Sequence, residues 1–165
     1  MSKEDRDILL DAFPQLKHIF PQLEDPEDNQ AVLLISKDDS SEAFAGILAG
    51  LYSKSPILFR ESKISEEEWE KKTDMIANTG QQINLFAGSS PERLCLVVTR
   101  LDQRPKWLIY HLKSLLENAA RKYLCIASAT DFKKIPALLS SHFHRVEYGK
   151  GKRKRVKKKA THREG

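Results

Sequence analysis

The residues with the plainest chemical role form a run of cations near the end of the chain. In Lys150–Lys159, KGKRKRVKKK, eight of ten positions are Lys or Arg. Such a run neutralises several phosphates and releases their counterions, which gives a salt-dependent, sequence-independent affinity for nucleic acid. The run holds no aromatic residue, so stacking on bases is not indicated within it. The candidate nucleic-acid-binding residues are Lys150, Lys152, Arg153, Lys154, Arg155, Lys157, Lys158 and Lys159.

Other interpretations of this basic run stay open. A nuclear-localisation signal has the same composition, and so does a solubilising tail. An anionic membrane would attract the cations too, but no amphipathic apolar face lies beside them. Residues 150–165 show no apolar periodicity, so we expect a disordered basic tail that follows a folded domain at residues 1–149.

The charge of the chain is unevenly distributed. The 165 residues include 28 Lys and Arg and 23 Asp and Glu, for a net charge of +5. The segment from Lys150 to Gly165 carries +8, and the 149 residues before it carry −3. The basic character therefore belongs to the tail, and the folded part is mildly acidic.

The composition also predicts the cellular compartment. No run of 18 apolar residues is present, and the N-terminal MSKEDRD lacks the apolar stretch of a secretory signal. We therefore expect no membrane partner and a cytoplasmic, nucleoid-associated protein, or a nuclear one in a eukaryote. Cys95 and Cys125 both fall inside expected strands, which favours buried, reduced thiols over a disulfide.

The segment after the first apolar run is where a phosphate-binding loop would lie. Ala31–Ile35 (AVLLI) is followed by Ser36–Glu42, SKDDSSE. A working loop reads G-x-x-x-x-G-K-[ST], because its glycines let backbone N–H groups wrap the phosphates and its lysine neutralises them. This loop has no glycine, and the carboxylates of Asp38, Asp39 and Glu42 would repel a triphosphate.

A second requirement for nucleotide hydrolysis is an acidic residue that holds Mg²⁺ after a buried strand. The apolar run Leu94–Val98 is followed by Thr99 and Arg100, and Asp102 comes too late to replace the missing acid. We expect Asp102 to be a turn or N-cap residue. Both halves of an ATPase site are thus lacking, and we predict no catalytic residue and no bound cofactor.

Metal and nucleophile sites are also weakly indicated. His142 and His144 would lie on one face of a strand, but their spacing matches no usual zinc pattern. Asp38, Asp39 and Glu42 are the alternative cation ligands, although acidic residues at a helix start also favour the helix dipole. No G-x-S-x-G nucleophile elbow occurs, and we predict no metal ligands.

The elements that position these residues alternate between strand and helix. One or two amphipathic helices within Asp5–Phe20, broken by Pro14 and Pro21, precede them. The pattern predicts an α/β fold with three layers and a mostly parallel five-stranded sheet flanked by helices. Expected strands are Ala31–Ile35, Pro56–Phe59, Leu94–Val98, Leu124–Ala127 and Phe143–Val146, and expected helices are Glu42–Ser53, Ser65–Ala77, Lys106–Asn118 and a short one ending near Leu139.

Four segments carry a resemblance to a known family. They are Asn84–Val98 (NLFAGSSPERLCLVV), Val97–Gln103 (VVTRLDQ), Leu112–Asn118 (LKSLLEN) and Ser128–Tyr148 (SATDFKKIPALLSSHFHRVEY). Their order resembles the AAA+ module of DNA polymerase clamp-loader subunits of the delta, delta-prime and gamma types, a P-loop NTPase core. The resemblance covers roughly Gln30–Tyr148.

The chain departs from that family at its catalytic positions. The family's Walker A and Walker B residues are replaced at Ser36–Glu42 and at Thr99 and Arg100, and the trans-acting arginine would fall at Ser141. Thr130 keeps the sensor-1 position. The helical lid and collar of the family have no counterpart before the basic tail. The resemblance thus implies a degenerate AAA+-like domain that binds rather than hydrolyses.

The expected function is that of an accessory subunit in DNA replication, repair or recombination. It would dock on a protein partner, such as an AAA+ subunit or a polymerase complex, and contact nucleic acid through its tail. A homo-oligomer is compatible with this interpretation. The alternatives are a nucleotide-dependent enzyme with an unrecognised site and a self-assembling adaptor protein.

Overall fold

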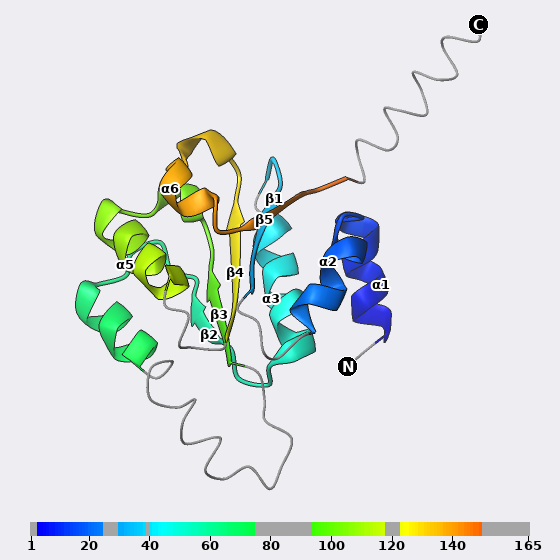
Figure 1. Ribbon diagram of the computed structural model, residues 1–165, viewed down its shortest axis with the longest axis horizontal. Helices are drawn as coiled ribbons and strands as arrows, with labels where there is room; N and C mark the ends of the chain where they lie inside the picture. The colour runs from blue at the N-terminus through cyan, green and yellow to red at the C-terminus, as the bar shows by residue number, and fades with distance from the viewer. Residues whose placement is uncertain (1–2, 25–29, 39, 75–93, 118–122, 150–165) are drawn as a thin grey trace, which may run out of the picture.

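Five parallel strands form one sheet in the computed structural model, with helices on both of its faces (Figure 1). The structure describes residues 3–24, 30–38, 40–74, 94–117 and 123–149. Strand order across the sheet is β2-β3-β4-β1-β5. The strands are β1 (Gln30–Ile35), β2 (Ile57–Phe59), β3 (Leu94–Val98), β4 (Tyr123–Ala129) and β5 (His144–Glu147).

Helices cover both faces of the sheet, which gives the three layers that the sequence predicts. On one face lie α1 (Lys3–Ala12), α2 (Leu16–Leu23) and α3 (Ser40–Tyr52) (Figure 1). On the other face lie α5 (Lys106–Glu117), α6 (Ala137–Ser140) and the helical residues 66–74. Two short 3₁₀ turns, η1 (Leu101–Gln103) and η2 (Phe132–Lys134), follow β3 and β4.

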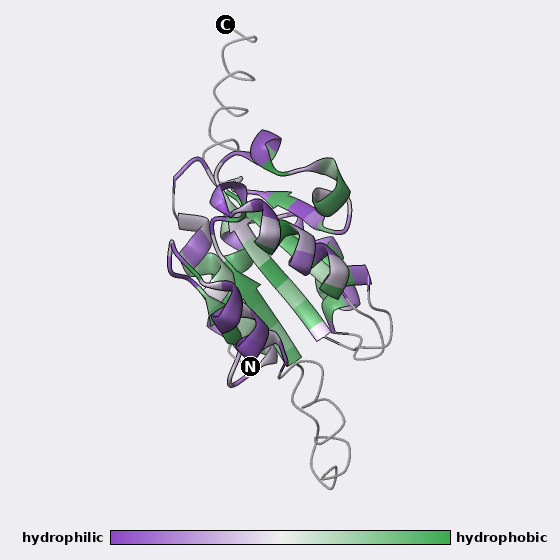
Figure 2. Cartoon of the chain, turned by 90° about the vertical axis from the view of Figure 1, so that its left-hand side faces the viewer, coloured by the Kyte–Doolittle hydropathy of each residue, from purple (hydrophilic) through white to green (hydrophobic). Residues whose placement is uncertain are grey.

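Alternation along the strands divides the core into two halves. In β1, Val32 and Leu34 pack with α1, α2 and α3, whereas Leu33 and Ile35 pack with the layer on the other face. Side chains alternate in this way because successive residues of a strand point to opposite faces. Apolar strands therefore lie between helices that carry hydrophilic residues outward (Figure 2). Both faces of the sheet are covered, as a parallel sheet requires.

The two thiols follow the same alternation. Cys95 packs in the core with α1, α2 and α3, and Cys125 packs in the core on the opposite face. Both are buried and neither forms a disulfide, which confirms the prediction of buried thiols. Burial raises the pKa of the Cys125 thiol, and the neighbouring Cys95 adds to that increase.

Most expected elements agree with the structure to within two residues. Leu94–Val98 has the predicted bounds. The Ser65 hydroxyl accepts a hydrogen bond from the Glu68 amide at 3.1 Å and so caps the helix that the sequence predicts from Ser65. The last strand begins at His144, one residue after Phe143. Phe143 lies in the preceding turn and still buries its ring. The predicted ends at Ala77 and Asn118 lie outside the described residues.

The prediction that Pro21 breaks a helix is wrong, whereas Pro14 lies between α1 and α2 as expected. Pro21 lies inside α2, two residues before its end. A proline within a helix costs about 3 kcal/mol. Each buried apolar side chain offsets that loss by roughly 1.5–3 kcal/mol. Four side chains of α2 are buried, and they are Leu16, Ile19, Phe20 and Leu23.

The helices are short relative to the thickness of a bilayer. Within the described ranges, no helix has the length and apolar content that crossing a membrane requires. The longest of the named helices, α3, has 13 residues, fewer than the roughly 20 that a membrane span needs.

Candidate functional site at the carboxyl edge of the sheet

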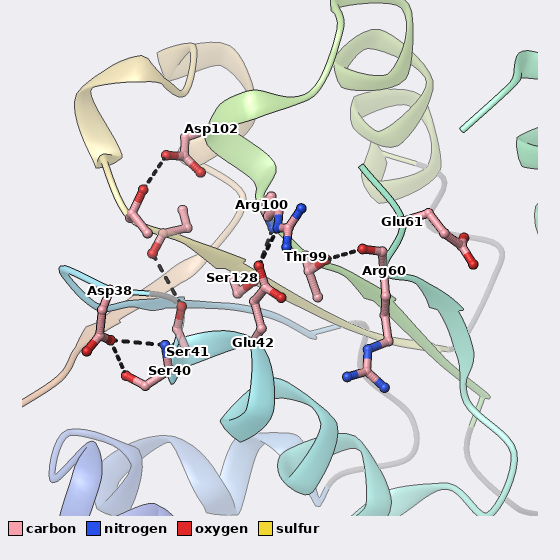
Figure 3. A network of polar contacts seen from close by, with 12 residues as sticks. Asp38, Ser40, Ser41, Glu42, Arg60, Glu61, Thr99, Arg100, Asp102 and Ser128 are labelled. Carbon is pink, nitrogen blue, oxygen red and sulfur yellow. Dashed lines mark hydrogen bonds and ion pairs between the residues drawn. The ribbon is translucent and has the colours of Figure 1, made fainter. Parts of the chain in front are cut away.

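Three loops meet where the strands end. The chain leaves β1 toward α3 on one face of the sheet, and it leaves β3 and β4 toward the opposite face. Neighbouring parallel strands whose connections diverge in this way form the crevice in which open α/β sheets bind ligands. Figure 3 shows the polar side chains of these loops converging at that edge. The site is built from the residues after β1, β3 and β4.

The loop after β1 closes on itself through short side chains. The Asp38 carboxylate accepts hydrogen bonds from the Ser40 amide at 3.0 Å and from the Ser40 hydroxyl at 2.5 Å (Figure 3). The Ser36 hydroxyl accepts from the Ser41 amide at 3.0 Å and donates to the Asp38 carbonyl at 2.5 Å. These amides lie in the first turn of α3. The N-terminus of a helix would otherwise offer such N–H groups to an anion. Both are satisfied within the loop.

These hydrogen bonds hold the Asp38 carboxylate in its charged form. The Ser40 hydroxyl and then the Ser40 amide lower the pKa of Asp38 below its ordinary value, because both donate to the ionised carboxylate. Sequence reasoning placed Asp38 at the start of a helix, and the structure confirms this position. Asp39, which the sequence analysis groups with Asp38 and Glu42, lies outside the described residues.

The loop after β3 begins with a residue in an unusual backbone conformation. Arg100 has a φ of 54°, which is the left-handed region, and its amide donates to the Ser128 hydroxyl at 3.2 Å. Its Nε lies 2.6 Å from a carboxylate oxygen of Glu42 in the first turn of α3. Arg100 thus ties the loop after β3 to β4 and to α3 (Figure 3). Its positive charge occupies the space beside the first turn of α3.

Arg104 joins the ends of β2 and β3 from inside the protein. Its side chain is 8% exposed, and its three nitrogens donate to the carbonyls of Thr99 at 2.9 Å, Phe59 at 3.0 Å and Glu61 at 2.5 Å. Burial lowers the pKa of Arg104, and the charge of Arg100 lowers it further. Thr99 is fully buried, and its hydroxyl donates to the Phe59 carbonyl at 3.4 Å. These contacts hold the loop after β3 in place.

Asp102 connects the loops after β3 and β4. Its Oδ2 accepts from the Thr130 hydroxyl at 2.9 Å and from the Asp131 amide at 3.0 Å. Asp102 lies in η1, so the sequence prediction of a turn residue is confirmed. Its partners lie on another loop, however, whereas an N-cap side chain bonds within its own helix. Thr130, the sensor-1 position of the resemblance, therefore uses its hydroxyl as a structural donor.

A cavity of about 450 Å³ opens between the loops after β1 and β4 and the end of β5. Lys37 and Lys133 line it, together with Arg145, whose guanidinium lies over the Phe132 ring at 3.8 Å from its centre. Asp38, Asp131 and Glu147 line the same space. Basic and acidic residues therefore both contribute to its walls. This mixture suits a ligand that carries both charges better than a polyphosphate.

The histidines of the sequence analysis have separate partners. His144 Nε2 lies 2.7 Å from the Gln30 side-chain oxygen, and His142 Nε2 lies 3.8 Å from the Glu117 carboxylate. Only His144 belongs to β5, so the two imidazoles do not share a strand face. Within the described ranges, no three His, Cys, Asp or Glu side chains are grouped so that they could hold a metal ion.

The structure brings some of the candidate residues together and leaves others outside. Residues on the loops after β1, β3 and β4 converge. The eight candidate nucleic-acid-binding cations of the tail, from Lys150 to Lys159, lie outside the described residues. Sequence reasoning missed Arg104, Ser128 and the pairing of Glu42 with Arg100. No local signal identifies these residues, since their partners lie up to 58 positions away.

The described part is therefore a three-layer α/β protein whose five-stranded sheet is parallel throughout, as the sequence predicts. Among solved structures, the chain is similar to a DNA polymerase III gamma subunit-related protein from Thermotoga maritima, with a TM-score of 0.60 and 15% sequence identity. The match covers 81% of this chain and 45% of that protein, so the chain spans less than half of that protein's length. The likeness shows that the two proteins share a fold over the matched residues.

The sequence comparisons add no family to this likeness. No protein-family model matches the chain, and no curated protein matches it. What is shown is the fold, because a structural likeness at 15% identity carries no activity with it.

Proposed function

We propose that this chain is a non-catalytic, AAA+-like accessory protein of DNA replication, repair or recombination. Its folded domain, residues 1–149, docks on a protein partner such as an AAA+ subunit or a polymerase complex. Its basic tail, residues 150–165, contacts nucleic acid, which we take to be DNA. No cofactor takes part.

One observation carries the non-catalytic half of this proposal, and it is the closed loop after β1. The helix-starting amides of Ser40 and Ser41 are bound by Asp38 and Ser36. Glu42 and Arg100 pair across the space next to them. A triphosphate would have to break these contacts and approach Asp38 and Glu42, and no lysine opens α3 to neutralise it.

Calorimetry with Mg²⁺–ATP, Mg²⁺–GTP and the free nucleotides tests this half. We expect no saturable binding up to millimolar nucleotide. Saturable micromolar binding would contradict the proposal and favour a nucleotide-dependent enzyme.

The charge of the tail carries the nucleic-acid half. Its eight cations in ten positions give the density that phosphate neutralisation requires. We propose to compare Lys157, Lys158 and Lys159, all changed to Gln, with a control in which Lys3, Lys63 and Lys71 of the domain are changed to Gln. Both triple variants remove the same charge. The three control lysines are all exposed.

Fluorescence anisotropy with a labelled duplex at several salt concentrations measures the difference. We expect the tail variant to weaken binding and to reduce the slope of log K against log salt by about 0.9 for each phosphate that it no longer neutralises. The control should retain the slope of the unchanged protein. An equal decrease of affinity in both variants would mean that the tail has no special role.

The protein-partner half is tested by affinity capture from a native lysate, with and without nuclease. We expect a protein partner that survives nuclease treatment. A partner that disappears with nuclease would be bound only through nucleic acid, and the docking role would then be wrong.

A second candidate function is a nucleotide-dependent enzyme with an unrecognised site. The position of the cavity of about 450 Å³ favours it, because the cavity lies in the crevice where such sheets bind ligands, although Asp38, Asp131 and Glu147 line it beside Lys37, Lys133 and Arg145. Changing Lys37 and Lys133 to Gln would abolish nucleotide binding in that case. The same calorimetry therefore separates the two functions.

A further inference from the structure

A small groove lies between η1, α5 and α6, away from the crevice at the ends of β1 and β4. Its volume is about 240 Å³. The helices that border it stand side by side on the face of the sheet opposite α1, α2 and α3 (Figure 1). Its apolar walls come from Ile109, Tyr110, Pro136 and Leu138.

Two of the apolar residues that line the groove are unusually exposed. Tyr110 is 57% exposed and Leu138 is 41% exposed. Among the described residues, only one other large hydrophobic side chain is classed as exposed, Ile8 at 47% on α1. A single exposed apolar residue needs no explanation, but two at one concave site mark a surface that gains from being covered.

The groove also has a positive rim. Lys106 and Lys134 line it, and neither ammonium group forms an ion pair among the described residues. Arg104 adds a third positive charge, although three of its five N–H groups donate to carbonyls of the protein. The occupant that complements this rim carries carboxylates.

Asp102 belongs to the lining of the groove and fixes its shape. Its Oδ2 accepts from the Thr130 hydroxyl and the Asp131 amide, which holds η1 against the loop after β4. Its Oδ1 is buried, out of reach of an occupant, so Asp102 acts on the groove only through the position of η1.

We propose that this groove binds a short acidic and apolar peptide segment of a partner protein. One large apolar side chain of the peptide enters between Tyr110 and Leu138. Flanking carboxylates of the peptide meet Lys106 and Lys134. The inference rests on the proposed docking role and supplies its surface, because a groove of about 240 Å³ fits a side chain rather than the face of a folded domain.

A peptide library displayed on phage, selected against the full-length protein, tests the proposal. We expect enriched peptides that share a Leu- or Phe-sized residue flanked by Asp or Glu. Leu138→Asp should weaken binding of a labelled selected peptide about thirtyfold, as removal of a central apolar anchor does. The matched control is Ile8→Asp, which places the same charge on an exposed apolar position of α1 and should leave the affinity unchanged.

Charge reversal at the rim gives a second, independent readout. With Lys106 and Lys134 both changed to Glu, binding of the acidic peptide should weaken about tenfold, and a new selection should enrich basic flanks instead. Circular dichroism checks that each variant keeps its fold. These changes lie on the surface, so the folded state should persist.

Four outcomes would overturn the inference. They are a failure to enrich any peptide, enrichment without acidic flanks, equal binding by Leu138→Asp, and a dimer in sedimentation that Leu138→Asp abolishes, since a second copy would then cover the groove. The capture experiment distinguishes failure of this groove from failure of the proposed docking role. If Leu138→Asp still captures the nuclease-resistant partner, the partner exists but uses another surface, whereas no partner for the unchanged protein contradicts the proposed function.

Discussion

Arg100 and Glu42 lie 58 positions apart in the sequence, and their side chains meet at an Nε–Oε1 distance of 2.6 Å. The pair links the loop after β3 to the first turn of α3. Glu42 is 18% exposed and Arg100 36% exposed, so water screens the attraction only in part. A second ion pair, Lys113–Glu117 on the outer surface of α5, provides a comparison.

The first prediction concerns the strength of this pair. A double-mutant cycle of Glu42→Gln and Arg100→Gln should give a coupling energy of about 1 kcal/mol, at the upper end for a partly exposed pair. The same cycle at Lys113 and Glu117 should give a smaller coupling energy, because that pair is more exposed and joins neighbouring helix turns. Urea unfolding measures both. Equal coupling energies would show that the Arg100–Glu42 pair contributes nothing beyond a surface contact.

The second prediction concerns the backbone of Arg100. Arg100→Ala and Arg100→Gly both remove the guanidinium, but only glycine adopts a φ of 54° without steric cost. We expect Arg100→Gly to be more stable than Arg100→Ala by about 1 kcal/mol. Denaturant midpoints measure the difference, and variants of equal stability would contradict a left-handed Arg100.

The third prediction concerns Arg104. Arg104→Met keeps the apolar stem and removes donors to the carbonyls of Thr99, Phe59 and Glu61. The free energy of unfolding should fall by about 3 kcal/mol, because the buried Thr99 carbonyl loses its donor and the carbonyls of Phe59 and Glu61 each lose one. Arg104→Lys should recover only part of the lost free energy of unfolding, since one ammonium group cannot reach three carbonyls.

The control for Arg104→Met is the same substitution at Arg60, next to Phe59 in the sequence. Arg60 is exposed, and only its backbone carbonyl takes part in the contacts of Thr99. Arg60→Met should change the free energy of unfolding by less than about 0.5 kcal/mol. Equal destabilisation at the two positions would mean that Arg104 does not join β2 and β3 as the structure indicates.

Sequence patterns are sufficient for the elements of the fold. The run Leu94–Val98 is apolar, β-branched at its end and bounded by polar residues, so its strand could be predicted with its bounds. Lys106–Asn118 shows helical spacing, and the structure has a helix at Lys106–Glu117. Such elements can be predicted because the spacing of apolar residues along the chain shows which side chains share the buried face of a helix or strand.

The contacts of the site could not be predicted in the same way. Which loops meet depends on strand order, and β1 lies between β4 and β5 although it comes first in sequence. Arg104 has the sequence context of an ordinary surface cation, yet its partners Phe59 and Glu61 lie 45 and 43 positions away. Pro21 does not break its helix because the burial of α2 against the sheet, a tertiary effect, outweighs the local cost of a proline.

The fourth prediction concerns the acid titration of Asp38. Its folded pKa lies below 3.8 because the Ser40 hydroxyl and amide donate to the charged carboxylate. Stability from this cap is fully present above the unfolded pKa and is lost as the pH falls through the lower, folded value. A titration followed by NMR at the Asp38 carboxyl carbon should therefore have its midpoint below pH 3.8.

Two serine variants test the cause of that shift. Ser40→Ala removes the largest cause of the lowered pKa, the hydroxyl donor, and should raise the Asp38 midpoint toward 3.8. Ser65→Ala removes a capping hydroxyl from the helical residues 66–74 and should leave the Asp38 midpoint unchanged. A midpoint that moves equally in both variants would mean that general destabilisation, rather than the Ser40 hydrogen bond, controls the charge of Asp38. The hydrogen bond from the Ser40 hydroxyl to Asp38 would then not be a contact that holds the loop after β1.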